Sequence, residues 1–126
     1  MMMKTIFLVG LGGAIGSILR YVSVWLMSKY FQGTFPLATL LINMLGSLLI
    51  GLFIGLLAKY FPENQPLKFL LIVGFCGGFT TFSSFASENY SLFQNGQQLM
   101  AYAYIAGSVL LTIAAVGIGN YLTKFI

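Results

Sequence analysis

The sequence lacks histidine and carries few charges. Among its 126 residues the only carboxylates are Glu63 and Glu88, and charged residues make up 6% of the chain. Histidine and carboxylate side chains are the usual metal ligands and the usual acid-base catalysts. Their scarcity argues against a side-chain metal site and against acid-base catalysis, so no enzymatic activity is expected. The single cysteine, Cys76, excludes a disulfide within the chain.

Hydrophobic residues make up 59% of the chain, whereas about a quarter of the residues in a soluble domain are charged. A helix needs about 20 apolar residues to cross a bilayer. Four apolar stretches meet this length, and they predict helices at roughly 5–28, 36–58, 67–93 and 99–121. We therefore predict an all-α, multi-pass protein of the cell membrane (plasma or inner membrane), with residues 1–126 forming a single transmembrane domain.

Six cationic residues are spread along the chain and form no basic run. The sequence therefore lacks the clustered positive charge that is typical of nucleic-acid binding. Four crossings place both ends of the chain on one side of the membrane. The cations predicted on that side are Lys4, Lys59, Lys68 and Lys124, while Lys29 lies on the other side. The positive-inside rule favours cytoplasmic termini, but a bias this small is compatible with insertion in both orientations.

The segment Gly74–Phe85 combines glycines and hydroxyl residues within an apolar stretch. Loose backbone and unpaired hydroxyls are costly in a membrane interior, so this run must line a wet cavity or lie at a protein contact. Glycine is a poor helix former, and we predict that the third helix is broken around Gly77 to Thr80. If the breaks of two copies cross, their bare carbonyls would hold a monovalent cation such as sodium.

Two other helices each present a stripe of hydrogen-bonding side chains at a spacing of four residues, which places each stripe on one helix face. The stripes are Thr39, Asn43 and Ser47 in the second helix and Tyr104, Ser108 and Thr112 in the fourth. Serine and threonine can also bond to their own helix or join neighbouring helices. A buried amide is harder to explain in that way. Asn43 and the two matching stripes therefore favour a polar track.

Phe82 and Phe85 lie three residues apart, on one side of the third helix, beside the predicted break. Ordinary packing is one explanation. The alternative is an anion site, because a phenyl ring has a positive edge. Arg20 either reaches the membrane interface or raises the potential of a vestibule that attracts anions. Glu88 is either the partner of a cation or a solvated residue at a pore mouth.

The chain is too short to enclose a pore by itself. A close-packed bundle of four short helices has a solid core and no lumen. A conduction path therefore requires surfaces from more than one copy.

Three motifs together carry a family resemblance: GGAIGSILRY at 12–21, PLATLLINMLGS at 36–47 and GFCGGFTTFSSF at 74–85. In these motifs, in its length and in its four-helix layout, the chain resembles the CrcB/Fluc-type fluoride channel family. The resemblance implies a fluoride-selective channel for passive fluoride export, built as an antiparallel, dual-topology homodimer with two pores. It also implies fluoride resistance as the physiological role.

The resemblance further implies roles for individual residues. The residues implied to line the fluoride pathway are Thr39, Asn43, Phe82, Ser83, Phe85, Tyr104, Ser108 and Thr112. Arg20 would serve the vestibule, and Glu88 would lie near the pore without a settled role. The backbone carbonyls of Gly77 and Thr80 would bind a structural sodium ion at the dimer interface.

Two other functions are compatible with a small four-helix membrane protein. A proton-coupled transporter of the small multidrug type requires a carboxylate buried in the first helix, and this chain has none there. A structural subunit of a larger membrane complex would leave Asn43 and the two polar stripes without a purpose.

Overall fold

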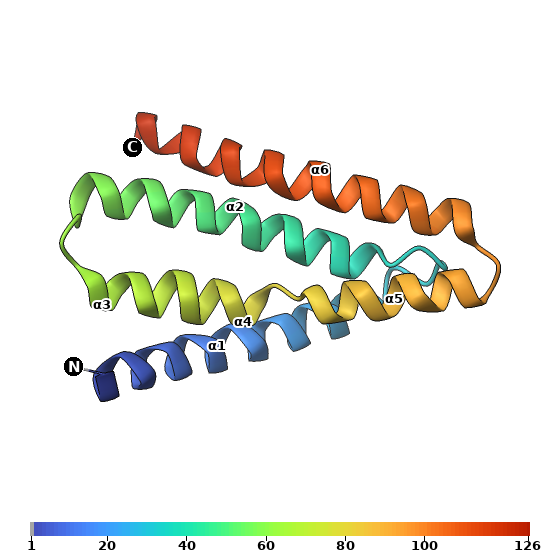
Figure 1. Cartoon of the computed structure of the whole chain (residues 1–126), viewed down its shortest axis with the longest axis horizontal. Helices are drawn as coiled ribbons and strands as arrows, with labels where there is room; N and C mark the ends of the chain where they lie inside the picture. Colours follow the sequence, from blue (N-terminus) through green and yellow to red (C-terminus); the bar gives the residue numbers. More distant parts are fainter. Residues whose placement is uncertain (1) are drawn as a thin grey trace.

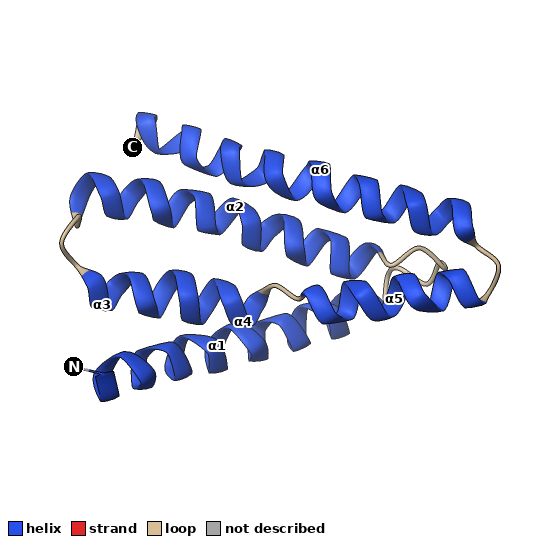
Figure 2. Ribbon diagram, in the orientation of Figure 1, coloured by secondary structure: helices blue, strands red, loops and turns tan. Residues whose placement is uncertain are grey.

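The structure is a computed structural model that describes residues 2–126. Its long helices are α1 (Met2–Ser28), α2 (Leu37–Tyr60), α5 (Phe82–Gln94) and α6 (Gln98–Leu122). The third crossing begins with α3 (Gln65–Lys68), continues as a π-helical segment (Phe69–Cys76) and then as α4 (Gly77–Phe79), and ends with α5. A short 3₁₀ turn (Thr123–Phe125) follows α6. The described residues form no strand (Figure 2).

Within residues 2–126, four segments are long and apolar enough to cross a membrane: Met2–Ser28, Leu37–Tyr60, Gln65–Gln94 and Gln98–Phe125. The prediction of an all-helical protein with four spans is confirmed. The observed bounds lie within one helical turn of the predicted bounds.

The four spans run side by side along the long axis of the molecule (Figure 1). Helix α6 packs along α2, and α1 packs against the π-helical segment and α4. Both ends of the chain lie at the same end of the bundle as the loop between α2 and α3 (Figure 1). This arrangement agrees with the predicted even number of crossings.

The third crossing leaves helical conformation at Thr80 and Thr81, whose ψ angles are 158° and 119°. Gly77 and Gly78 remain helical. The interruption therefore lies at the C-terminal edge of the predicted range, and the glycine pair itself does not unwind.

Close packing against α1 explains why position 78 is a glycine. A Cβ atom built there would lie 2.5 Å from the carbonyl oxygen of Gly13 and 3.0 Å from its Cα. Small residues at such crossings let two membrane helices approach at backbone distance. The glycine thus supports the contact between α1 and α4, which positions the interruption beside α1.

Candidate functional site

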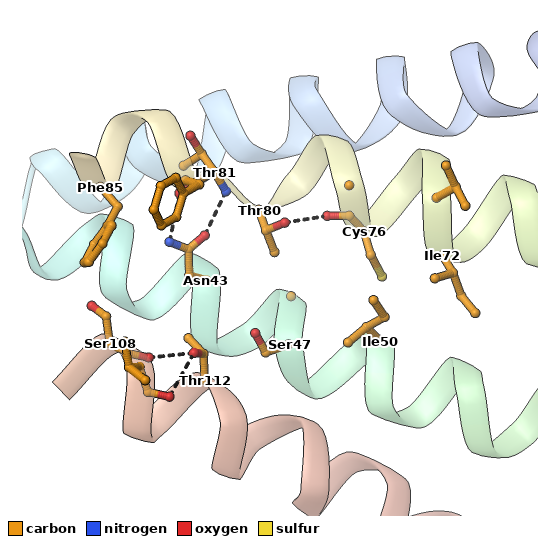
Figure 3. Close-up of a pocket in the computed structure, with 15 residues that line it drawn as sticks. Asn43, Ser47, Ile50, Ile72, Cys76, Thr80, Thr81, Phe85, Ser108 and Thr112 are labelled. Carbon is orange, nitrogen blue, oxygen red and sulfur yellow. Dashed lines mark hydrogen bonds between the residues drawn. The ribbon is translucent and has the colours of Figure 1, made fainter. Parts of the chain in front are cut away.

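The interruption of the third crossing is clamped by one side chain of α2. The Oδ1 atom of Asn43 accepts the Thr81 N–H at 2.8 Å, and its Nδ2 atom donates to the Thr81 carbonyl at 3.0 Å (Figure 3). Both backbone groups of an extended residue are thereby satisfied without a helical partner, as a buried backbone requires. The same two bonds satisfy the side-chain amide of Asn43, so they offset the free-energy cost of burying that amide.

Two carbonyls on the α4 side of the interruption accept hydrogen bonds, those of Cys76 and Gly78. The backbone N–H and the hydroxyl of Thr80 both donate to the Cys76 carbonyl, at 3.0 and 2.8 Å. The Nε atom of half-buried Arg20 donates to the Gly78 carbonyl at 3.1 Å. Carbonyls in the last turn of a helix lack an intrahelical partner. Arg20 supplies one for Gly78, and the Thr80 hydroxyl adds a second bond to the Cys76 carbonyl.

On the α5 side, Thr81 caps the new helix. Its Oγ1 atom accepts the Ser84 N–H at 3.1 Å and lies 3.3 Å from the hydroxyl of Ser83. A threonine with extended backbone at this position is a common helix start. The sequence signal was therefore present, but Thr81 was not among the predicted site residues.

An open groove of about 400 Å³ lies beside the interruption, between α2, the third crossing and α6 (Figure 3). It brings together predicted residues from three separate parts of the chain. Those that line it are Asn43, Gly77, Thr80, Phe82, Phe85, Ser108 and Thr112. Ser47, Cys76 and Thr81 line it as well. The predicted residues outside it are Arg20, Thr39, Ser83, Glu88 and Tyr104.

Two hydroxyls of the polar stripe on α6 face this groove, and only one of them has a hydrogen-bond partner. Thr112 donates its hydroxyl back to the Ser108 carbonyl, so the back-bonding alternative holds for Thr112 in this conformation. The hydroxyl of Ser108 is buried and has no hydrogen-bond partner among residues 2–126. A buried, unpaired hydroxyl that faces a groove is a donor available to a ligand.

Phe82 and Phe85 form an aromatic group at the end of the groove. Their ring centroids are 5.5 Å apart, with an interplanar angle of 44°. Phe85 also meets Tyr104 edge-on, at 5.0 Å and 61°. Phe82 is 78% exposed, so α5 holds Phe85 against its neighbours and leaves Phe82 on the open face.

The two polar stripes converge on Glu88. Thr39 donates to its Oε2 atom at 2.7 Å, and Tyr104 donates to its Oε1 atom at 2.9 Å. One carboxylate therefore links α2, α5 and α6. The hydroxyls of Thr39 and Tyr104 are committed to Glu88 in this conformation, and neither faces the groove.

Glu88 also lines a second cavity, of about 370 Å³, on the other side of the interruption. Arg20, Thr39, Thr81 and Ser84 line the same cavity. A third cavity, of about 330 Å³, shares Glu88 and opens between the loop before α2 and the end of α5. Half-buried Arg20 lines the second cavity and donates to the Gly78 carbonyl at the end of α4, and its predicted role at the interface or in a vestibule stays a prediction.

The family described as CrcB-like protein, Camphor Resistance (CrcB), matches residues 7–120. The chain belongs to the CrcB family. The resemblance predicted from the three motifs is thus confirmed.

Similar proteins match this CrcB family member over almost its whole length. It is 50% identical to "Fluoride-specific ion channel FluC" of Flavobacterium psychrophilum, over 97% of this chain and 98% of the relative. Proteins of the same name match it at 44% identity in Azobacteroides pseudotrichonymphae and at 41% in Chlorobium phaeobacteroides. Those two alignments cover 98% of this chain and 99% and 98% of the relatives.

Proposed function

We propose that this protein is a fluoride-selective ion channel that passively exports fluoride and lowers its concentration in the cytoplasm. The observation that carries the proposal is the groove, where neutral donors and phenyl rings from three parts of the chain meet beside a clamped interruption. The similar proteins that match this chain over almost its whole length are named as fluoride-specific ion channels, which supports the same ion. The function is transport and involves no catalytic step.

Fluoride is small and strongly hydrated, so a narrow path must replace its water shell. Amide and hydroxyl groups can donate to the anion without the deep binding that a fixed positive charge would cause. Conduction requires binding that is favourable for entry and weak enough for exit. The second Nδ2 hydrogen of Asn43 and the hydroxyl of Ser108 are suitable donors, and the ring edges of Phe82 and Phe85 add weak positive potential.

A single copy has this path open on one side, which supports assembly as a homodimer. Phe82 and Gly77 are exposed beside the groove, and a second copy would complete its wall. We place the two copies antiparallel in the membrane, with one fluoride pathway on each side of their interface. The small charge bias between the two ends of the bundle is compatible with insertion in both orientations.

The same dimer would hold one sodium ion where the interruptions of the two copies cross at the middle of the membrane. Gly77 and Thr80 line the groove on the face assigned to the partner. Neutral carbonyl oxygens at an interrupted membrane helix suit a hard monovalent cation. The ion would supply positive charge that ties the two interruptions together, and the carbonyls of Gly77 and Thr80 would be its ligands.

The proposal is tested by ion efflux from liposomes that contain the purified protein. Fluoride and chloride release are followed with ion-selective electrodes, and potassium is made permeable so that charge is balanced. We expect rapid fluoride release and almost no chloride release. Equal release of the two anions would refute selectivity, and retention of both would refute channel function.

A further inference from the structure

Two backbone N–H groups at the interruption are diverted from their helical acceptors by side chains. In an uninterrupted α-helix the Thr81 N–H would donate to the Gly77 carbonyl, four residues earlier. Here it donates to Oδ1 of Asn43 at 2.8 Å. The Ser84 N–H would likewise donate to the Thr80 carbonyl, and here it donates to Oγ1 of Thr81 at 3.1 Å. Side-chain acceptors have thus replaced the carbonyls of Gly77 and Thr80.

The neighbouring carbonyls of Cys76 and Gly78, in contrast, do accept hydrogen bonds. The Cys76 carbonyl accepts two hydrogen bonds from Thr80, and the Gly78 carbonyl accepts one from Arg20. The hydroxyl of Thr80 is turned toward Cys76, so it does not compete for the carbonyls near the groove. The carbonyls of Cys76 and Gly78 therefore accept hydrogen bonds, whereas those of Gly77 and Thr80 have lost the N–H groups that would bond to them in a continuous helix.

Access to the relieved carbonyls is open at Gly77. A Cβ atom built on this glycine would meet no other atom within 4 Å, and both Gly77 and Thr80 line the groove. A side chain at this position would cover the face from which an ion approaches.

We infer that Asn43 and Thr81 are positioning residues that hold the carbonyls of Gly77 and Thr80 free for a monovalent cation. This inference rests on the proposed cation site and assigns the side chains that create it. Asn43 acts through the Thr81 N–H, and Thr81 acts through its hydroxyl on the Ser84 N–H. Without either acceptor, the freed N–H returns to its helical carbonyl and occupies a cation ligand.

The experiment measures how sodium stabilises the purified full-length protein in detergent. An ion that binds only the folded state raises the melting temperature in a concentration-dependent manner. Sodium chloride is titrated against choline chloride at constant total salt, so that ionic strength and chloride do not vary. The variants are Thr81→Val, which keeps the side-chain shape and loses the hydroxyl, and Thr81→Ser, which keeps the hydroxyl.

We expect the sodium concentration for half-maximal stabilisation to rise about 10- to 100-fold in Thr81→Val, the range typical for loss of groups that orient metal ligands. Thr81→Ser is expected to match the wild type. A clamp that only holds the fold would lower the melting temperature of Thr81→Val equally at every sodium concentration. An unchanged midpoint in Thr81→Val would therefore overturn the inference.

Two further outcomes are informative. If Thr81→Val does not fold, Asn43→Ala is titrated in the same way, and an unchanged midpoint there overturns the inference. A wild-type protein that does not respond to sodium would overturn this inference together with the cation site. Selective fluoride efflux from liposomes in that case would leave the anion channel proposal standing.

Discussion

The carboxamide of Asn43 on α2 bonds both the N–H and the carbonyl of Thr81, at 2.8 and 3.0 Å. A side chain of one crossing thus replaces the helical partners of a residue in another crossing. The pair ties α2 to the point where the third crossing is interrupted, and it places a spare amide hydrogen beside the groove. The proposed channel depends on this pair for its shape and for one of its donors.

Replacing Asn43 with alanine removes both bonds. The Thr81 N–H can then return to the Gly77 carbonyl, but the Thr81 carbonyl is left without a partner. Each lost hydrogen bond typically costs about 1 kcal/mol, and a buried group left unpaired costs about 1–3 kcal/mol. We expect Asn43→Ala to lower the melting temperature and to reduce fluoride efflux from liposomes strongly. Asn120→Ala is the matched control, because Asn120 is exposed near the end of α6 and does not line the groove. Equal efflux from both variants would contradict a role for Asn43.

Replacing Phe82 or Phe85 with isoleucine keeps an apolar side chain and removes the ring edge. We expect either change to reduce fluoride efflux strongly, because a branched alkyl group lacks the positive potential at the edge of a phenyl ring. Phe93→Ile is the control, since Phe93 lies on the same helix, packs against Tyr102 and does not line the groove. Efflux at the wild-type rate in both test variants would show that the anion takes another path.

The bonds from Thr39 and Tyr104 to Glu88 predict energetic coupling across three helices. A hydrogen bond to a charged group contributes about 1.5–3 kcal/mol. We expect Tyr104→Phe to destabilise the protein by a value in this range, because the ring contacts with Phe35 and Phe85 remain. In Glu88→Ala the same tyrosine change should cost much less, and a double-mutant cycle of unfolding free energies measures the difference. Strict additivity would exclude the bond.

Two glycines of α1 provide a matched test of how closely this helix packs. A Cβ atom on Gly16 would clash with the backbone of Phe75 and Phe79, whereas one on Gly10 would meet no atom within 4 Å. Overpacking typically costs about 1–3 kcal/mol, while glycine inside a helix costs about 0.5–1 kcal/mol relative to alanine. We expect Gly16→Ala to lower the melting temperature and Gly10→Ala to maintain or raise it. A reversed order would contradict the contact between α1 and the third crossing.

The four crossings were predictable because they depend on apolar length, which is a local property of the sequence. The groove was predictable in part, since a spacing of four residues places Asn43 with Ser47 and Ser108 with Thr112 on single helix faces. The hydrogen bonds that Thr39 and Tyr104 donate to Glu88 were not predictable. They depend on side-chain conformations that bring three helices together, and the sequence pattern treats those hydroxyls as equivalent to the others in each stripe.

The exact place of the interruption also depends on tertiary contacts. Propensity alone suggests a break at Gly77 and Gly78, at a cost of about 1 kcal/mol per glycine in a helix. The structure keeps both glycines helical, because Gly78 packs against Gly13 of α1. The helix ends at Thr80 and Thr81, where Asn43, 38 positions away in the chain, supplies the competing bonds. Thr81 could be identified as a helix start, but its partner on α2 could not.

The most direct measurement of the central claim is the reversal potential of the wild-type protein in a planar bilayer. The bilayer separates two solutions that contain the same concentration of cation and opposite gradients of fluoride and chloride. A path that strips and passes fluoride alone predicts a current that reverses near the equilibrium potential of fluoride. Reversal at the chloride potential, or near zero, which is the equilibrium potential of the cation, would contradict selective conduction through the groove.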